Sequence, residues 1–381
     1  MRFPEFTEEW VNVSLKDVAD FQKERISSGL LDESTYISTE NILQNFQGVQ
    51  SAISIPANTN VVAYKKNDIL LSNIRPYLKK VWFSDRIGGC SADVFVLRSK
   101  TCEPEFLYNV IASDKFINYV MSGAKGVKMP RGDKNQMESF SFSIPAVAEQ
   151  RKISRLFQLL DERIATQNKI IEKYESLIQA IIYQKKTDGI RKENWQKTEL
   201  SKVLKERNEK NINGLVVCSV SVSQGVINQI EYLGRSFAAK ETSHYNVVRY
   251  GDIVYTKSPT GDFPYGIVKR SCIKNAVAVS PLYGVYTPDN ENIGVILHFY
   301  FMQPNNAFNY LHPLIQKGAK NTINITNERF LENSIPLPKT KNEALYIANA
   351  LISIHKKIDI EKNLLRSYEK EKEYLLRHMF I

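Results

Sequence analysis

Basic, amide and hydroxyl side chains gather at two corresponding places in this sequence, and their types suit contact with a nucleic-acid duplex. In the first half the candidates are Ser72, Asn73, Arg75, Tyr77, Lys79, Lys80, Lys125, Lys128, Arg131 and Lys134. In the second half they are Lys257, Ser258, Thr260, Lys317, Lys320, Asn321 and Arg329. Lys and Arg bind phosphates, and Arg, Asn and Ser can hydrogen-bond to base edges in the major groove. Each residue alone could equally be an ordinary solvated loop residue, so the prediction depends on the set.

The overall charge favours the same kind of partner. The chain has 381 residues, with 51 Lys and Arg against 41 Asp and Glu, so its net charge is +10. A protein this basic often binds a polyanion, and nucleic acid is the usual one. A basic protein with no anionic partner remains open. The first residues lack a basic stretch followed by an apolar run, so we expect a cytoplasmic protein without membrane contact.

The common motifs of catalysis are missing from the sequence. It contains no G-x-x-x-x-G-K-[ST] phosphate loop, no HExxH zinc motif and no G-x-S-x-G nucleophile turn. The five histidines are scattered, and the four cysteines have no metal-ligand spacing. We therefore predict no catalytic, cofactor-binding or metal-binding residues, and reduced, buried thiols at Cys90, Cys102, Cys218 and Cys272. A binding protein is favoured over an enzyme with an unrecognised site.

The sequence segments that must position the candidate residues occur twice along the chain. Asp68 in NDILLS matches Asp252 in GDIVYT, and Trp10 in EEW matches Trp195 in ENW, at separations of 184 and 185 residues. An Ile-Pro pair precedes a helical stretch in both copies. Each copy begins with short β-like runs rich in Val, Ile and Tyr, followed by helical stretches. This order predicts a duplicated protein of the α+β class.

Each copy ends in a long amphipathic helix whose apolar residues recur at alternating steps of four and three. The first seam is Ile153, Phe157, Leu160, Ile164, Gln167, Ile171, Tyr174, Ile178 and Ile181. The second seam is Ile347, Leu351, Ile354, Ile358, Glu361, Leu365, Tyr368, Lys372 and Leu375. This heptad pattern is typical of a coiled coil. The alternative is that each helix packs only on its own domain.

The lengths of these helices favour pairing. Residues 149–186 would extend about 57 Å as a helix, whereas a domain of this size is only about 40 Å across. The second domain begins where the first helix ends and finishes where the second begins, so close domain termini require antiparallel helices. We predict a first domain at 1–143, a first helix at 144–190, a second domain at 191–334 and a second helix at 335–381, with pseudo-two-fold symmetry.

This layout resembles the specificity subunit of type I restriction–modification systems along the whole chain. The resemblance is carried by the EEW and ENW openings, the NDILLS and GDIVYT strands, and the junction IPAVAEQRKISRLFQLLDERI. In that family the junction is expected to hold Ile-Pro, Glu149-Gln150, Ile153 and Leu160-Asp161. The second junction departs from this pattern, because it has three more residues before the helix, lacks the Gln and has His355 in place of the Asp.

The resemblance implies two target-recognition domains, each reading one half of a bipartite site on double-stranded DNA, and paired helices that also dock methyltransferase subunits. Those subunits would bring S-adenosylmethionine, and a restriction motor-nuclease subunit would bring ATP and Mg²⁺. This chain would then be the non-catalytic DNA-recognition subunit of an adenine methyltransferase and endonuclease complex, with no cofactor of its own. A coiled-coil scaffold whose two domains bind protein rather than DNA remains the alternative.

Overall fold

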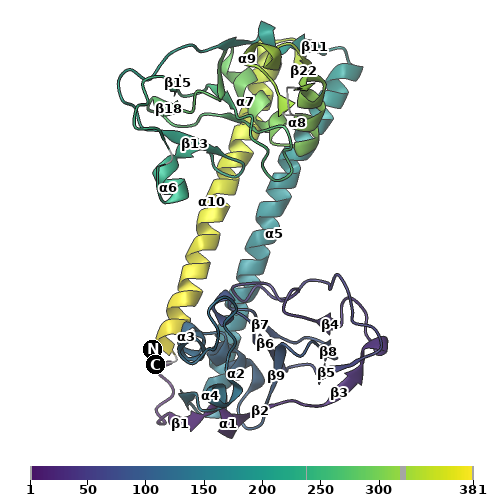
Figure 1. The fold of residues 1–381 in the computed structure, drawn as a ribbon, viewed down its shortest axis with the longest axis vertical. Helices are drawn as coiled ribbons and strands as arrows, with labels where there is room; N and C mark the ends of the chain where they lie inside the picture. The colour runs from purple at the N-terminus through teal and green to yellow at the C-terminus, as the bar shows by residue number, and fades with distance from the viewer. Residues whose placement is uncertain (1, 237, 318–322, 380–381) are drawn as a thin grey trace. The chain divides into compact units, whose positions relative to one another are not determined.

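Figure 1 shows the fold of the chain in a computed structural model, which describes residues 2–236, 238–317 and 323–379. The chain divides into two compact units. Unit 1 comprises residues 1–168 and 364–381, and unit 2 comprises residues 169–363. Both units mix short strands with helices, which confirms the predicted α+β class.

The central sheet of unit 1 has four antiparallel strands, in the order β2 (Ala19–Phe21), β9 (Val94–Ser99), β6 (Ile69–Ser72) and β7 (Val81–Phe83). The β6 sequence ILLS is apolar on both faces because both faces are covered. Ile69 and Leu71 pack with the helical residues Phe106 and Phe116, while Leu70 packs into a separate cluster on the other side.

That other cluster belongs to a second sheet in unit 1. Its strand order is β3 (Arg25–Ser27), β5 (Asn60–Tyr64), β8 (Gly88–Cys90) and β4 (Tyr36–Ile37), with β4 parallel to β8. A two-stranded ribbon pairs β1 (Val11–Ser14) with β10 (Ser141–Ile144).

Four shorter helices complete unit 1, namely α1 (Leu15–Val18), α2 (Pro104–Ile111), α3 (Asp114–Ser122) and α4 (Lys134–Glu138). Single-turn 3₁₀ helices occur at Ser28–Leu30 and Pro76–Leu78. Local sequence explains where the helices begin, since Pro104 stands at the start of α2, and the Ser113 and Asp133 side chains cap α3 and α4.

Unit 2 repeats the central sheet of unit 1 strand by strand. Its order is β12 (Leu204–Glu206), β19 (Gly284–Pro288), β16 (Ile253–Tyr255) and β17 (Val268–Arg270). The ribbon of β11 (Trp195–Glu199) and β22 (Ser334–Pro338) corresponds to the β1–β10 ribbon. The helices α7 (Glu291–Phe301), α8 (Pro304–Leu311) and α9 (Asn327–Phe330) follow in the same order as α2, α3 and α4. The predicted duplication is confirmed.

The remaining strands of unit 2 form three short ribbons. They are β13 (Cys218–Ser221) with β14 (Gly225–Asn228), β15 (Asn246–Val248) with β18 (Val277–Val279), and β20 (Gln316–Lys317) with β21 (Ile323–Asn324). The helix α6 (Gln229–Leu233) follows β14, and 3₁₀ turns lie at Leu200–Lys202 and His312–Leu314.

The matched aspartates Asp68 and Asp252 have the same structural role in the two units. Both are 1% exposed. Asp68 accepts two hydrogen bonds of 2.7 Å from the Arg98 guanidinium, and Asp252 accepts bonds of 2.7 and 3.0 Å from Arg207. Each also accepts the backbone N–H of the residue three positions earlier. The aspartate therefore fixes the turn that leads into the third strand of each central sheet.

Two long helices accompany the sheets, α5 (Val147–Arg191) and α10 (Lys341–Met379). Every residue of the two predicted seams is buried or half-buried, which confirms the heptad pattern. In unit 1, Asp161 of α5 pairs with Lys372 of α10. The Arg163 guanidinium lies 5.1 Å from the ring centroid of Tyr368. The later α5 residue thus meets the earlier α10 residue, so these segments are antiparallel.

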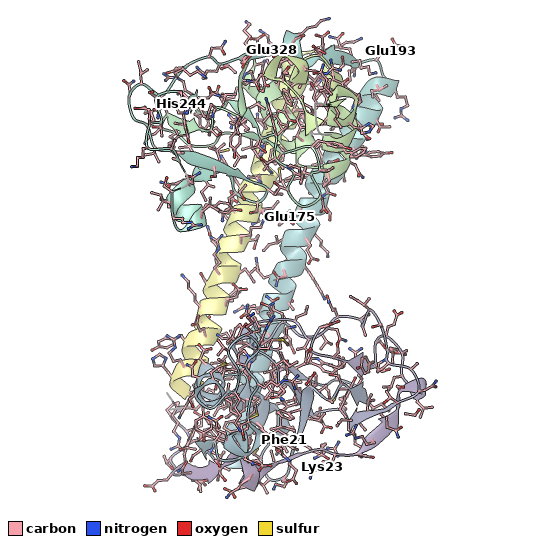
Figure 2. All side chains as sticks on the ribbon, in the orientation of Figure 1. Phe21, Lys23, Glu175, Glu193, His244 and Glu328 are labelled. Carbon is pink, nitrogen blue, oxygen red and sulfur yellow. The ribbon has the colours of Figure 1, made fainter. Side chains whose placement is uncertain are left out.

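The segments of the same helices in unit 2 are antiparallel as well. Glu175, which Figure 2 labels, forms a 2.7 Å ion pair with Lys362. The Lys185 ammonium lies 5.4 Å from the ring centroid of Tyr346. Between Glu175 and Lys185, α5 advances while its partner residues on α10 step back from Lys362 to Tyr346, as predicted for antiparallel helices.

Three of the four cysteines are buried as predicted, but Cys272 is exposed. It directly follows β17 and Ser271, where the chain leaves the sheet, so the prediction for this thiol was wrong. Within the described ranges, no helix is long and apolar enough to cross a membrane. No group of three or more His, Cys, Asp and Glu side chains among the described residues could hold a metal ion.

Candidate nucleic-acid interface

The two candidate segments of the first half come together in unit 1. The loop that joins β6 to β7 carries Asn73 to Lys80, the loop before α4 carries Lys125 to Arg131, and Lys134 begins α4. The Arg75 N–H donates to the Pro130 carbonyl at 2.8 Å, and the Gly132 N–H donates to the Asn73 carbonyl at 3.1 Å. These backbone bonds join segments that are some fifty residues apart in the sequence, so the grouping predicted from residue type is also a spatial one.

Three candidates in these loops project into solvent. Arg75, Tyr77 and Lys128 are exposed, and Tyr77 retains 49% of its accessible surface. Neither the Arg75 guanidinium nor the Lys128 ammonium has a hydrogen bond or ion pair with another described residue. Arg75 adopts the left-handed conformation with φ of 51°, which begins the turn at Pro76. Arg75 and Lys128 are therefore the cations most available to an incoming anion.

Four other cations of the set are already held by carboxylates. Lys79 pairs with Asp114 at 2.6 Å, Lys125 with Asp133 at 2.9 Å, Arg131 with Asp93 at 2.8 Å, and Lys134 with Glu138 at 3.4 Å. The Lys134 ammonium also lies 5.0 Å from the ring centroid of Phe21, which is labelled in Figure 2. The hydrogen bond between Lys125 and Asp133 raises the pKa of the lysine and lowers the pKa of the aspartate. A phosphate would have to compete with these partners.

The other candidates of unit 1 point inward. Ser72 is 1% exposed, and its hydroxyl donates to the Ile74 carbonyl at 3.0 Å. The Lys80 ammonium donates to the Thr39 carbonyl, and burial lowers its pKa. Asn73 is half-buried, with its amide oxygen shielded from solvent and without a hydrogen-bond donor among the described residues. These three side chains therefore support the structure around the loop and are not fully exposed to solvent.

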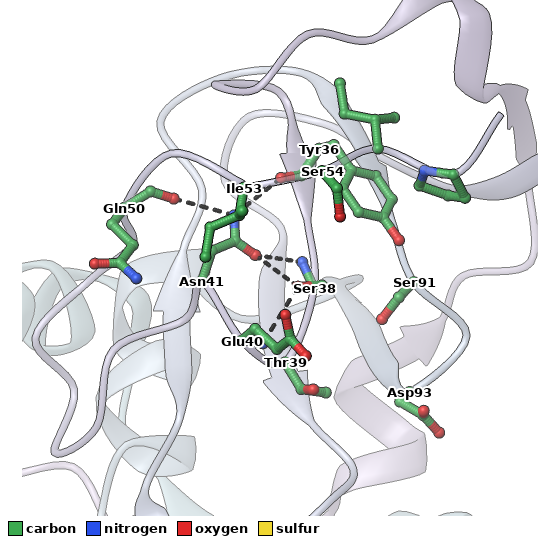
Figure 3. Close-up of a pocket in the computed structure, with 12 residues that line it drawn as sticks. Tyr36, Ser38, Thr39, Glu40, Asn41, Gln50, Ile53, Ser54, Ser91 and Asp93 are labelled. Atoms are coloured by element: carbon green, nitrogen blue, oxygen red, sulfur yellow. Dashed lines mark hydrogen bonds between the residues drawn. The ribbon is translucent and has the colours of Figure 1, made fainter.

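A hollow of about 370 Å³ lies in unit 1 and is lined by polar residues that include Ser38, Asn41, Gln50 and Asp93 (Figure 3). Asn41 does not present its amide to the hollow as a free group. Its oxygen accepts from the Ser38 N–H at 2.5 Å, and its nitrogen donates to the Gln50 carbonyl at 3.0 Å. Asp93, at the rim, pairs with Arg131 of the candidate interface. Hydroxyl and carboxylate groups are among the groups that line the hollow.

In unit 2 the equivalent loop joins β16 to β17. Ser258 and Thr260 are exposed, and Lys257 is half-buried with its pKa lowered by burial. Thr260 and Phe263 exchange backbone hydrogen bonds of 3.1 and 3.0 Å. Gly266 has φ of +96°, and a Cβ there would lie 1.8 Å from the Thr256 carbonyl oxygen. Glycine is therefore required for the loop to return to β17.

The last candidates of unit 2 follow α8 in the chain, and Arg329 lies within α9. Arg329 is held by the Leu314 carbonyl at 2.8 Å and by Glu332 at 3.4 Å. Lys317 lies in the β20–β21 ribbon, whose backbone the structure describes. Lys320 and Asn321 lie outside the described residues.

Reasoning from sequence missed the carboxylates that hold the interface cations. Asp93 directly precedes β9 and Asp114 is the first residue of α3, and neither position carries a local signal of these pairings. Asp133 could have been found, because GDKNQ places an acidic cap directly before a short helix.

Comparison with known proteins shows which proteins this chain resembles in sequence and in fold. The type I restriction modification DNA specificity domain matches residues 7–176. The chain is 24% identical over 187 residues to the EcoDI type I restriction enzyme specificity subunit of Escherichia coli, and this match covers 47% of the chain and 42% of that relative. The matched part thus spans less than half of that relative's length. The chain is also 22% identical over 400 residues to the MjaVIII type I specificity subunit of Methanocaldococcus jannaschii, covering 97% and 91%.

Solved structures share the fold at low sequence identity. The S subunit of a type I restriction–modification system from M. genitalium superposes with a TM-score of 0.62 and 12% identity, over 98% of this chain and 96% of that one. A chain from a study of complex assembly and conformational transition of the type I R-M system gives a TM-score of 0.55 and 17% identity, over 97% and 96%. Residues 7–176 are thus matched by a type I restriction–modification specificity domain, and the chain as a whole is similar to type I specificity subunits in sequence and in fold.

Proposed function

We propose that this chain recognises a bipartite DNA site, with one half read by the domain in each unit. One observation carries the proposal. The loop between the third and fourth strands of the central sheet bears cations and hydrogen-bonding groups in both units, at Arg75 and Tyr77 in one and at Lys257, Ser258 and Thr260 in the other. Two copies of the same loop, one in each unit, suit a DNA site with two half-sites. Their centres would lie about one helical turn of DNA apart, which is ~34 Å.

The proposed recognition domains are residues 1–143 and 191–334, and the proposed spacers are residues 144–190 and 335–381. In this arrangement Arg75 and Lys128 make the first phosphate or base contacts in unit 1. Four further cations join them when each leaves its carboxylate partner and binds a DNA phosphate instead. These are Lys79, Lys125, Arg131 and Lys134. The candidate DNA contacts of unit 2 also include Lys317, Lys320, Asn321 and Arg329.

The partners that we propose are methyltransferase subunits, docked on the long helices, and a restriction motor-nuclease subunit. S-adenosylmethionine, ATP and Mg²⁺ would then belong to those subunits, in the cytoplasm, and the chain itself would be non-catalytic. The matches to specificity subunits support this division of labour. They do not favour the alternative of a scaffold whose domains bind protein.

Salt-dependent binding tests the DNA contact directly. We expect Arg75→Ala and Lys128→Ala to weaken duplex binding by the chain assembled with its methyltransferase subunits. Each lost phosphate contact should reduce the slope of log affinity against log salt by about 0.9. If Arg75 instead reads a guanine, its loss should cost ~1–3 kcal/mol and relax one base position.

Lys65→Ala is the matched control for these variants. Lys65 is an exposed lysine, 55% accessible, that precedes β6 and so lies at the end of the strand opposite the loop. Its removal should leave the salt slope unchanged. Identical slopes for wild type, Arg75→Ala and Lys128→Ala would remove this surface from the interface.

A further inference from the structure

The loop before α4 presents an apolar tip to solvent. Residues 125–129 are all exposed, and Val127 retains 100% of its accessible surface. Met129 retains 48%. Single exposed apolar residues are common in proteins, so exposure alone assigns nothing to Val127. The construction of the loop and its surroundings are more informative.

The base of this loop is closed by its own backbone. Lys125 and Arg131 exchange two hydrogen bonds of 2.9 Å, and the buried Pro130 accepts the Arg75 N–H at 2.8 Å. Gly126 has φ of +96°, a conformation that glycine adopts without strain. The closed base holds residues 126–129 away from the body of unit 1, so Val127 cannot fold back onto the core.

Cations surround the apolar tip, and two of them are already paired with carboxylates. Lys128 is the next residue along the chain, Lys125 and Arg131 form the base, and Arg75 is bonded to Pro130. Lys128 and Arg75 have no anionic partner among the described residues. An apolar protein surface would have to desolvate these cations without compensation, whereas a duplex offers phosphates to them and base edges to the valine.

We propose that Val127 enters the major groove and packs against the C5-methyl group of a thymine in the half-site read by unit 1. Met129 extends the apolar contact. The thymine methyl is the apolar group that base edges present in that groove, and a valine isopropyl group offers no hydrogen bond that would suit any other base. Val127 thereby adds sequence preference, while the cations around it add affinity. The inference rests on the proposed function, because it requires unit 1 to bind duplex.

The test removes each side of the proposed contact in turn, first the C5-methyl group of the thymine and then the apolar side chain of Val127. Methylation mapping of cells that carry the whole system first defines the site. Binding of the chain assembled with its methyltransferase subunits is then measured on the mapped duplex. A matched series replaces each thymine of this half-site singly with deoxyuridine. For wild type we expect one position at which deoxyuridine lowers affinity about fourfold, the value for one buried methyl group.

Val127→Ser should show the same loss on the thymine duplex and no further loss with deoxyuridine. Its salt slope should equal that of wild type, because no phosphate contact is removed. The control is Ile87→Ser, which changes an exposed isoleucine of the loop between β7 and β8 and should keep the deoxyuridine effect.

The failures are distinguishable. Absence of salt-dependent binding to the mapped duplex would overturn the proposed function itself. Normal binding in which deoxyuridine has the same effect on wild type and Val127→Ser would overturn only the contact with thymine. Loss of assembly with the methyltransferase subunits in Val127→Ser would assign the tip to a protein contact and overturn the inference.

Discussion

At the scale of single residues, the interface cations of unit 1 differ in what they must give up to bind DNA. Arg75 and Lys128 have no partner among the described residues, whereas Arg131 is paired with Asp93, 38 residues earlier in the chain. Residue type and duplication were enough to predict where the cations gather. The pairings of Lys79 with Asp114 and of Arg131 with Asp93 could not be predicted, because a carboxylate distant in sequence reaches its partner only through the fold.

The carboxylates should limit indiscriminate DNA binding. Asp133 both caps α4, through the N–H groups of Asn135 and Gln136, and holds Lys125. Asp133→Asn keeps a capping oxygen but removes the charge, which frees Lys125. We expect affinity for duplex of unrelated sequence to rise about fivefold at 0.15 M salt, with a salt slope steeper by about 0.9.

Competition binding with unrelated duplex measures this effect. Asp289→Asn is the matched control, because Asp289 forms a 3.1 Å pair with the exposed Lys205 outside the candidate set. An Asp133→Asn protein with wild-type affinity for unrelated duplex would show that the pair does not restrain Lys125.

At the scale of elements, the start of α5 shows how the matched junction sequence works. Glu149 is 0% exposed and binds Arg2 through two hydrogen bonds of 3.0 and 2.9 Å. Gln150 accepts the Glu103 N–H at 2.8 Å and donates to the Pro145 carbonyl at 2.8 Å. The junction of the second copy differs because Ala344 fills the place of the glutamine and is buried at 1% exposure. The sequence revealed this departure, but only the structure shows which bonds are lost with it.

Gln150→Ala should therefore destabilise unit 1. The substitution leaves the half-buried Glu103 N–H and the buried Pro145 carbonyl without their side-chain partner, at a cost of ~1–3 kcal/mol in the free energy of unfolding. Urea denaturation measures the change. Gln158→Ala, on an exposed position of the same helix, should stay within about 0.5 kcal/mol of wild type. Equal losses for the two variants would contradict the proposed bracing role of Gln150.

The packing of α7 against β17 predicts sensitivity to acid in unit 2. Burial lowers the pKa of His298 to about 3 from an ordinary value of 6.5, helped by Lys269, His355 and Arg270. Its Nδ1 accepts the Arg270 N–H at 3.1 Å. Between pH 6.5 and about 3 the unfolded chain binds a proton that the folded chain excludes, so the free energy of unfolding falls as pH falls through this window.

Urea denaturation at a series of pH values tests this linkage. His298→Gln should flatten the dependence of the free energy of unfolding on pH between pH 6.5 and 4, although the variant is less stable throughout because it disturbs a half-buried, hydrogen-bonded site. His244→Gln, at the exposed histidine labelled in Figure 2, should keep the wild-type dependence. If the free energy of unfolding of His298→Gln fell with pH as it does in wild type, the proposed role of this histidine would be contradicted.

At the scale of the whole molecule, the duplication and the two seams were predictable because they are periodic in the sequence. The arrangement of strands was not. Strands such as β12, β16 and β17 have three residues each, too few to show a period, and their order depends on long-range pairing. The extra ribbon of β13 and β14 in unit 2 likewise had no counterpart from which to predict it.

The central claim is that each domain reads its own half of the DNA site. The most direct test replaces residues 1–143 with the corresponding domain of a second specificity subunit that recognises a different sequence. The exchanged gene is expressed with the methyltransferase and motor-nuclease genes, and genomic methylation is mapped. We expect one half-site to change to that of the donor while the other half-site is unchanged. A change in both half-sites, or the original site retained intact, would contradict the account.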